Sequence, residues 1–343
     1  MMNDFSNLLE FNDQFNNEDN CRQYFESIRF QNGDFCPHCG HSKIFRFSDG
    51  KRYRCEKCRK DFTIKTGTLF GESKIPLQKW FIAIYLLTTR KKGISSIELA
   101  EQVGVSQKTA WFMDHRIREA MKQDNGKLFG TVETDETYIG GKEKNKHTKK
   151  RIKGTQGRST TTKTPIMGMV QRGGKVRTTV LPDVKVKTIE DAIFGNVRKG
   201  SKIYSDDFIS YRNLPKYYKH RVVKHRDNEY VRGDVHSNSV ESFWALFKRG
   251  YHGTYHSMSK KHLQRYVDEF AFRFNNRTTE MSEKFAELVQ QISNRGNVSY
   301  EAVIGEKAPQ VILRSIKGRN LTLTLQNITR YEKRQTTKKA QTY

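Results

Sequence analysis

Two Cys-x-x-Cys pairs constrain the fold of this chain more than any other feature of its sequence. The four cysteines are Cys36, Cys39, Cys55 and Cys58, and fifteen residues separate the two pairs. Each pair can bring two thiolates to one tetrahedral ion if the intervening segment turns back as a hairpin. Four thiolates complete a closed site, so the nearby His38 and His41 are not required as ligands. The spacing therefore predicts a structural zinc site, whose binding energy stabilises the fold.

The remaining composition indicates a reducing compartment and a polyanionic partner. Cys21 is the one cysteine outside the two pairs, and this arrangement favours metal binding over a disulfide framework. The chain has 343 residues, a formal net charge of +26 and a pI of about 9.8. A positive charge of this size is typical of proteins that contact nucleic-acid phosphates.

Membrane insertion and secretion are not indicated. The N-terminus has no basic region followed by an apolar core, so no signal peptide is predicted. The longest apolar run, residues 80–87, is too short to cross a bilayer. The sequence therefore predicts a cytoplasmic protein without a membrane partner.

Hydrophobic periodicity predicts helices in the first half of the chain and a mixed sheet in the second. Helices are predicted at 21–28, 76–92, twice within 94–121, at 188–197, across 237–275 and within MSEKFAELVQQI. Strands are predicted at 130–139, 165–171, 175–182, 202–206 and 221–224, with a small hairpin within QVILRSIKGRNLTLTL. Arg172-Gly173-Gly174 is typical of a hairpin turn. This order predicts an α/β (α+β multidomain) fold with helices flanking a mixed sheet.

Residues 93–121 have the pattern of a helix-turn-helix. Gly104 permits a tight turn, Val105 fills the junction and Ser106 can cap the second helix. The side chains predicted to face inward from the first helix are Ile97, Leu99 and Ala100. The residues predicted to contact DNA at the start of the second helix are Ser106, Gln107, Lys108 and Thr109. A small three-helix core without DNA contact is the alternative explanation.

A basic segment follows the first predicted strand of the sheet. Its cations are Lys142, Lys144, Lys146, Lys149, Lys150, Arg151 and Lys153. Such a cluster suits sequence-independent contact with the DNA backbone, and we assign Lys149, Lys150 and Arg151 to this role.

Three acidic positions lie far apart in the second half of the chain. They are Asp135 in TVETDETYIGG, Asp206 in KIYSDDFISY and Glu241 in HSNSVESFWALFK. Carboxylates that converge from separate elements can hold paired divalent metal ions against a phosphodiester. Glu133 and Glu136 compete with the first of these positions. Asp207 competes with the second, and the Asp-Asp pair could instead cap a following helix.

Glu241 lies on a helix with two distinct faces. At ~100° per residue, the apolar stripe consists of Val240, Phe243, Trp244 and Phe247. The neighbouring face consists of Asn238, Glu241, Ala245 and Lys248. This places Glu241 at the edge of the core, with Lys248 two turns further along to contact a phosphate. An ordinary glutamate paired with a basic neighbour is the alternative.

The sequence resembles bacterial insertion-sequence transposases of the ISXO-like group, which have a zinc ribbon and a DDE-type catalytic domain. The matching phrases are FCPHCG, YRCEKCRKDFTIKTGTLF, GVSQKTAWFMDHRIREAM, VETDETYIGGK and HSNSVESFWALFKRGYHGTYHSMSKKHLQRYVDEFAFRFNNR. They follow the order of the family and cover about residues 20–280. The resemblance implies a ribonuclease H-like fold, dependence on Mg²⁺ (or Mn²⁺), and cutting and joining of transposon ends.

The resemblance also implies roles for single residues. Asp135 matches the first catalytic Asp, and Asp206 matches the second, with Tyr211 at the expected distance after it. The family usually has Gly where this chain has Asp207, which leaves that part of the match incomplete.

The third catalytic position has two candidates. Glu241 and Lys248 match the terminal acid and the basic residue that follows it. Some members of the group have Asn in place of this acid, so Asn238 remains an alternative to Glu241.

These observations predict a DNA transposase that binds terminal repeats, cleaves strands and transfers them. The expected segments are a disordered N-terminus (1–20), a zinc ribbon (21–72), a helix-turn-helix domain (73–124), a ribonuclease H-like catalytic domain (130–280) and a C-terminal extension without an assigned role (281–343). The expected partners are double-stranded DNA of the ends and the target, and further copies of the chain on DNA, in the bacterial nucleoid. A noncatalytic DNA-binding regulator is the alternative, and a nuclease without joining activity is a third possibility.

Overall fold

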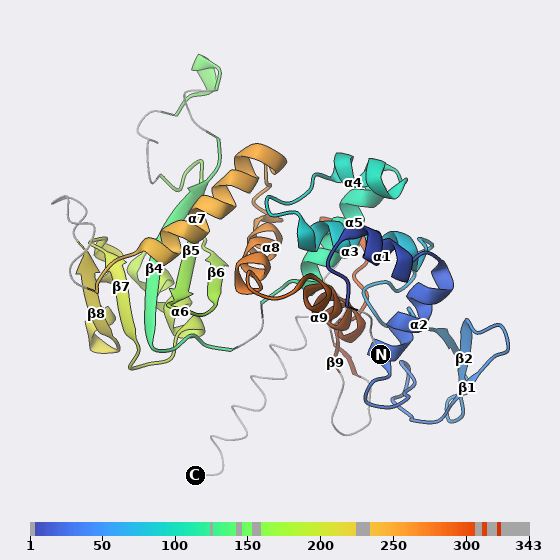
Figure 1. Ribbon diagram of the computed structural model, residues 1–343. Helices are drawn as coiled ribbons and strands as arrows, with labels where there is room; N and C mark the ends of the chain where they lie inside the picture. Colours follow the sequence, from blue (N-terminus) through green and yellow to red (C-terminus); the bar gives the residue numbers. More distant parts are fainter. Residues whose placement is uncertain are drawn as a thin grey trace, which may run out of the picture. The chain divides into compact units, whose positions relative to one another are not determined.

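The computed structural model describes residues 4–123, 126–141, 146–152, 159–223, 234–305, 311–313 and 321–323. The chain forms two units, each with its own core (Figure 1). The first unit comprises Met1–Arg90, Ser96–Ala120 and Thr279–Tyr343, and the second comprises Lys91–Ser95 and Met121–Thr278. The chain therefore leaves the first unit for the second and returns to the first at its C-terminal end.

Residues 4–20 are folded, contrary to the disorder that we expected for the first twenty. Their helices are α1 (Leu8–Gln14) and α2 (Glu18–Arg29). Asn7 and Asn17 accept hydrogen bonds from backbone N–H groups in the first turns of these helices. Phe5, Phe11 and Phe15 are buried. The polar composition misled the prediction because Asn7 and Asn17 are helix N-caps and the nearby phenylalanines supply a core.

A three-stranded antiparallel sheet carries the cysteine pairs. Its strands are β1 (Ile44–Arg46), β2 (Arg52–Cys55) and β3 (Asp61–Thr63), in the order β1-β2-β3. Tyr53 and Phe62 pair across β2 and β3, and their ring centroids are 5.3 Å apart. The first cysteine pair precedes β1. Cys55 is the last residue of β2, and Cys58 lies in the turn from β2 to β3. The hairpin predicted between the pairs is therefore present.

Among the described residues, the first unit also contains helices from the middle of the chain and from its C-terminal part. They are α3 (Leu77–Thr89), α4 (Ser96–Val103), α5 (Gln107–Ala120), α9 (Met281–Asn294) and α10 (Tyr300–Ile304). Gly104 has a φ of +66°, and Ser106 accepts a backbone hydrogen bond as the N-cap of α5, as predicted. Leu99 and Ala100 are buried, but Ile97 is 62% exposed, which contradicts our prediction. Ile97 precedes Leu99 by two residues, and roughly 200° of rotation puts the two on opposite sides of α4.

The C-terminal segment helps to build the core of the first unit. The amphipathic helix predicted beyond residue 280 is α9, and its Phe285 packs against aromatic rings of α1 and α3. Arg116 of α5 is buried and donates hydrogen bonds to the carbonyl groups of Leu69, Gly71 and Val298. The predicted hairpin is the antiparallel pair β9 (Val311–Leu313) and β10 (Leu321–Leu323).

A five-stranded mixed sheet forms the centre of the second unit. Its strands are β4 (Thr131–Ile139), β5 (Thr164–Gln171), β6 (Val176–Val180), β7 (Lys202–Asp206) and β8 (Lys219–Val223), in the order β6-β5-β4-β7-β8. β4, β5 and β6 form an antiparallel meander, and β7 and β8 run parallel to β4. Gly173 in the turn from β5 to β6 has a φ of +68°, as a hairpin turn requires.

Helices cover both faces of this sheet (Figure 1). They are α6 (Val186–Asn196), α7 (Asn238–Gly250) and α8 (Leu263–Asn275), and shorter helical turns are η2 (Thr148–Lys150), η3 (Ile209–Tyr211), η4 (Leu214–Lys216) and η6 (Tyr251–Tyr255). α6 packs on the face that carries Val132, and α7 and α8 pack on the face that carries Ile139. Because side chains alternate along a strand, Asp135 lies on the α7 face. The predicted mixed sheet with flanking helices is confirmed.

Candidate active site

Asp135 and Asp206 lie on neighbouring parallel strands. Glu133 of β4 pairs with Tyr204 of β7. This is the last pair recorded between the two strands, and the same register continued by two residues would align Asp135 with Asp206, the last residue of β7. Both aspartates belong to the α7 face by the alternation of strand side chains. Asp206 is buried, and its carboxylate accepts a hydrogen bond from the N–H of Phe208 at 3.2 Å.

The environment of Tyr211 indicates the same convergence. Tyr211 is buried, and its hydroxyl donates a hydrogen bond to Glu136. Burial raises the pKa of this hydroxyl well above its ordinary value, and the negative charges of Glu136, Asp135 and Asp206 raise that pKa further. The hydroxyl therefore remains protonated, and three carboxylates share its neighbourhood.

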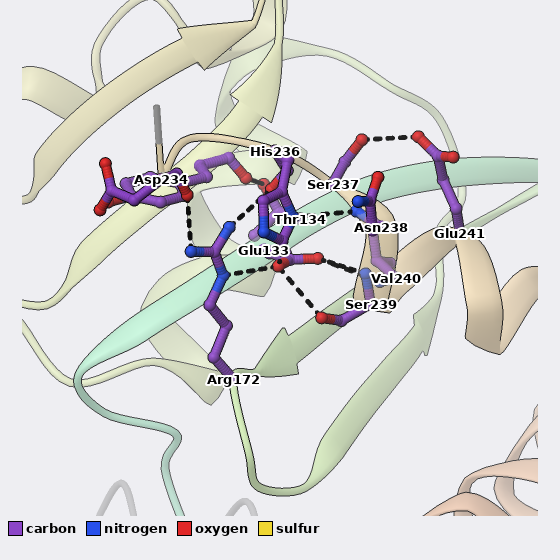
Figure 2. A network of polar contacts seen from close by, with 11 residues as sticks. Glu133, Thr134, Arg172, Asp234, His236, Ser237, Asn238, Ser239, Val240 and Glu241 are labelled. Atoms are coloured by element: carbon purple, nitrogen blue, oxygen red, sulfur yellow. Dashed lines mark hydrogen bonds and ion pairs between the residues drawn. The ribbon is translucent and has the colours of Figure 1, made fainter. Parts of the chain in front are cut away.

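Glu133 connects β4 to the start of α7 (Figure 2). Its side chain is fully buried, two residues before Asp135 on the same face of the strand. The carboxylate accepts hydrogen bonds from the backbone N–H groups of Ser239 at 2.7 Å and Val240 at 3.2 Å, and from the hydroxyl of Ser239 at 3.1 Å. A carboxylate is favourable at this place because unpaired N–H groups and the positive end of the helix dipole point toward it.

Arg172 extends this contact into a polar network around Glu133. Its Nε donates to Glu133 at 2.7 Å, and its terminal nitrogens donate to the carbonyl groups of Asp234 at 2.6 Å and His236 at 3.1 Å. The guanidinium also lies 4.8 Å from the ring centroid of Tyr204. One network therefore joins β4, the turn from β5 to β6, and the residues that lead into α7.

The predicted faces of α7 are confirmed. The buried stripe consists of Val240, Phe243, Trp244 and Phe247, and the exposed residues beside it are Asn238, Glu241, Ala245 and Lys248. The hydroxyl of Ser237 donates to the Glu241 carboxylate at 2.6 Å, so this side chain turns back toward the start of the helix (Figure 2).

Trp244 brings α7 close to the sheet next to Asp135. Gly168 of β5 pairs with Asp135 of β4. A Cβ atom on Gly168 would lie 2.6 Å from the Trp244 ring, closer than carbon atoms can approach. Glycine at this position therefore allows the helix to seat directly over the strand that flanks Asp135.

The strand register places Asp135 and Asp206 on neighbouring strands, and the structure does not gather Asp135, Asp206 and Glu241 into one ligand cluster. Among the residues that it describes, the four cysteines form the one group of three or more ligand atoms within 4.8 Å of one another. Without a cation between them, carboxylates repel one another. In a two-metal site the ions lie about 3.5–4 Å apart, so carboxylates that bind different ions need not contact each other. The donor set around Asp135 and Asp206 consists of oxygen atoms, which suits Mg²⁺ or Mn²⁺.

The cysteine sulfur atoms form a closed cluster in the first unit. The Sγ atoms of Cys36 and Cys58 are 3.7 Å apart, and those of Cys39 and Cys55 are 3.6 Å apart. Four sulfurs at about 2.3 Å from a tetrahedral zinc ion would be separated by about 3.8 Å. The cluster therefore fits structural zinc with all four coordination positions filled by protein.

The predicted DNA contacts of the first unit lie at the start of α5. Ser106, Gln107 and Lys108 are exposed, and Thr109 is half-buried. The ammonium of Lys108 lies 5.0 Å from the ring centroid of Tyr300 in α10, so the C-terminal segment contributes to this surface.

The basic segment of the second unit is described in part. Lys149 and Arg151 are exposed, and Lys150 ends the helical turn η2. Lys142, Lys144 and Lys153 lie outside the described residues.

Sequence reasoning missed the connecting role of Glu133 and did not consider Arg172 or Gly168 as site residues. The signal for Glu133 was its spacing of two from Asp135, which places both on one face of a strand. Its partner at the start of α7 is 106 residues away, and sequence spacing gives no information on that contact.

Comparisons with known proteins agree with the geometry. Residues 127–275 match the model of the ISXO2-like transposase domain, and residues 16–61 match that of a transposase zinc-ribbon domain. An uncharacterized protein in transposable element ISH50 of Halobacterium salinarum is 31% identical over 258 residues, which cover 72% of this chain and 87% of that protein. The chain belongs to the ISXO2-like transposase family. The resemblance inferred from the motifs is thereby confirmed.

Further similarities of the transposase are weaker. An uncharacterized transposase-like protein of Haemophilus influenzae is 30% identical over 103 residues, or 30% of the transposase and 82% of that protein. A chain of the simian T-cell lymphotropic virus intasome in complex with PP2A regulatory subunit B56 gamma shows 13% identity and a TM-score of 0.26, with coverage of 55% and 68% of the two chains. A chain of the Mos1 strand transfer complex shows 15% identity and a TM-score of 0.25, with coverage of 65% and 79%. Among the described helices of the transposase, none is both long and apolar enough to pass through a membrane.

Proposed function

We propose that this transposase binds the terminal repeats of its element and catalyses strand cleavage and strand transfer at their ends, with Asp135 and Asp206 among its catalytic residues. The observation that supports this proposal is that they belong to neighbouring parallel strands and, by the alternation of side chains, to the same face of the sheet. A DNA-binding regulator would have no need for acidic groups gathered in this way.

Asp135 and Asp206 would hold divalent cations, Mg²⁺ or Mn²⁺, and the first turn of α7 would add Glu241 or Asn238. When bound, such ions supply activation of an attacking hydroxyl group and stabilisation of the entering and leaving oxygens of an in-line displacement. To bind an ion, the Glu241 carboxylate would release the hydrogen bond that it accepts from the Ser237 hydroxyl. Lys248, exposed in the last turn of α7, would hold a phosphate beside the reacting strand.

DNA recognition would be divided among the domains. The zinc ribbon (21–72) and the helix-turn-helix (73–124) would bind the terminal repeats, with the exposed start of α5 contacting base edges. The catalytic domain (130–280) would receive the reacting strand, and Lys149, Lys150 and Arg151 would contact the backbone without reading sequence. Two ends must meet for transposition, so we expect a dimer or larger assembly on DNA.

The test is cleavage and strand transfer on terminal-repeat DNA with Mg²⁺ or Mn²⁺. We expect activity in the wild-type chain, loss in Asp135→Ala and in Asp206→Ala, and retention in Asp207→Ala, the matched neighbour. Equal activity of Asp135→Ala and wild type would refute the assignment. Tight binding of the repeats by wild type without any cleavage would identify a regulator, and cleavage without transfer products would identify a nuclease.

The same assay decides the third ligand. Glu241→Ala and Asn238→Ala are neighbouring changes in one exposed helical turn, so their effects on stability should be similar. The variant that loses cleavage in Mg²⁺ while still binding the repeats identifies the residue that completes the site.

A further inference from the structure

A basic surface separate from the candidate active site lies at the end of the sheet where β4, β7 and β8 begin. It is formed by residues 126–130, 194–202 and 214–219, which we call the strand-start surface. Backbone hydrogen bonds join Leu128 to Asn196 and Arg198, Tyr217 to Gly200, and Ser201 to Lys219. Three separate segments are therefore fixed against one another, and their side chains have a defined arrangement.

The strand-start surface is basic throughout. Its three segments contain six cations and no Asp or Glu, and the cations are Lys127, Arg198, Lys199, Lys202, Lys216 and Lys219. All six are exposed, and none forms an ion pair with the carboxylate of a described residue. Lys202 is partly offset by Asp234, since its charge is one of those that lower the pKa of that carboxyl. An excess of positive charge over negative charge attracts a polyanion.

Two exposed aromatic rings hold cations in place on this surface. Phe129 is 54% exposed and Tyr217 is 44% exposed. The guanidinium of Arg198 lies 5.4 Å from the ring centroid of Phe129, and the ammonium of Lys199 lies 5.7 Å from that of Tyr217. Because each ring already has a cation of the protein within cation–π distance, the arrangement suits phosphate contact more than stacking on unpaired bases.

The strand-start surface is separated from the carboxylates along the strands. Lys202 begins β7 and Asp206 ends it, which corresponds to roughly 13 Å along the strand. The strand-start surface is therefore not part of the carboxylate site, although a single duplex is wide enough to span this distance. Phosphate contacts carry no sequence information, so this surface suits DNA that is bound without regard to sequence.

We propose that the strand-start surface binds the phosphate backbone of the target duplex. Binding of a duplex here follows from the charges of the strand-start surface alone. That this duplex is the target DNA rests on the proposed function.

The test uses the full chain with Arg198→Glu and Lys199→Glu combined. The matched control combines Lys175→Glu and Lys187→Glu, exposed residues of the same unit that undergo the same change in charge. Binding of a duplex without terminal repeats is measured against salt. A plot of log affinity against log salt concentration has a negative slope. We expect the magnitude of this slope to be smaller by about two in the surface variant than in the control. In the strand-transfer assay, transfer should fall about tenfold relative to end cleavage.

The outcomes separate this proposal from the proposed function. If the surface variant and the control variant have the same salt slope and the same ratio of strand transfer to end cleavage, target binding at the strand-start surface is overturned. Binding of polyglutamate is measured on the same variants. Loss of polyglutamate binding in the surface variant, with duplex binding equal to that of the control, would overturn the proposal and indicate an acidic protein partner. Absence of end cleavage in the wild type would count against the proposed function, while the salt slopes would still test duplex binding. If the Glu variant does not fold, Arg198→Gln with Lys199→Gln provides the same comparison.

Discussion

Glu133 and Ser239 join β4 to α7 through two hydrogen bonds, from the Ser239 N–H at 2.7 Å and from its hydroxyl at 3.1 Å. Glu133 lies two residues from Asp135, and Ser239 lies between Asn238 and Glu241 in the chain. The contact therefore links the strand that carries Asp135 to the helical turn that carries both candidates for the third catalytic residue. We infer that Glu133 is a positioning residue and not a metal ligand, since both its oxygens are occupied by the start of α7.

Glu133→Gln should impair catalysis more than folding. Glutamine has nearly the same size, but its amide nitrogen cannot accept the hydrogen bonds that the carboxylate oxygen receives. We expect cleavage to fall about 10–100-fold, as for residues that orient metal ligands, and the Mg²⁺ concentration for half-maximal rate to rise. Initial rates across a Mg²⁺ titration measure both effects.

Ser239→Ala is the matched control for this change, because it removes the hydroxyl and keeps both backbone hydrogen bonds to Glu133. Its loss of activity should be smaller. If Glu133→Gln lowers the melting temperature but leaves the Mg²⁺ requirement at the wild-type value, Glu133 has a purely structural role.

Gly168→Ala should separate α7 from the sheet beside Asp135. The added Cβ would lie 2.6 Å from the Trp244 ring, so the ring and its helix must move. Overpacking of this kind costs about 1–3 kcal/mol of folding free energy. We expect a lower melting temperature and loss of cleavage, both partly restored by Trp244→Phe. The control is Gly195→Ala on α6, where a Cβ would meet nothing within 4 Å; equal effects of both glycine variants would contradict the explanation.

Local signals accounted for much of the fold. The strand Lys202–Asp206, the hairpin turn at Gly173 and the two faces of α7 follow from alternation, turn residues and helical periodicity, which act over a few residues. The cluster of four cysteines was predictable for the same reason, because each Cys-x-x-Cys pair is a local unit. Asp135 and Asp206 could be placed at strands from their neighbours in sequence.

Features that depend on distant contacts could not be predicted. The partners Arg116 and Val298 are 182 residues apart, so nothing local indicated that the C-terminal segment returns to the first unit. Ile97 belongs to an apolar pattern but lies on the outer side of a short helix. The choice between Asn238 and Glu241 also remains a prediction, since both side chains are exposed in one turn.

Cys39→Ser should release zinc and unfold the ribbon. Three thiolates leave one coordination position open, and the metal binding energy that stabilises the small sheet is reduced. We expect less than one zinc per chain by metal analysis, with loss of terminal-repeat binding. Cys21→Ser is the matched control because Cys21 is a buried thiol outside the cluster. Full zinc occupancy in Cys39→Ser would show that the four sulfurs do not form the site.

His220 should make stability depend on pH in the weakly acidic range. Burial lowers the pKa of its imidazole from 6.5, and its Nε2 lies 2.9 Å from the Ser205 hydroxyl. The unfolded chain therefore binds this proton more readily than the folded one. The stability that the neutral imidazole provides is present in full above pH 6.5 and is lost as the pH falls below it. His220→Gln removes this titration, so its melting temperature should change less than that of wild type between about pH 7 and 5. The control, His147→Gln at an exposed histidine, should follow the wild-type curve; identical curves for all three proteins would exclude His220 as the source.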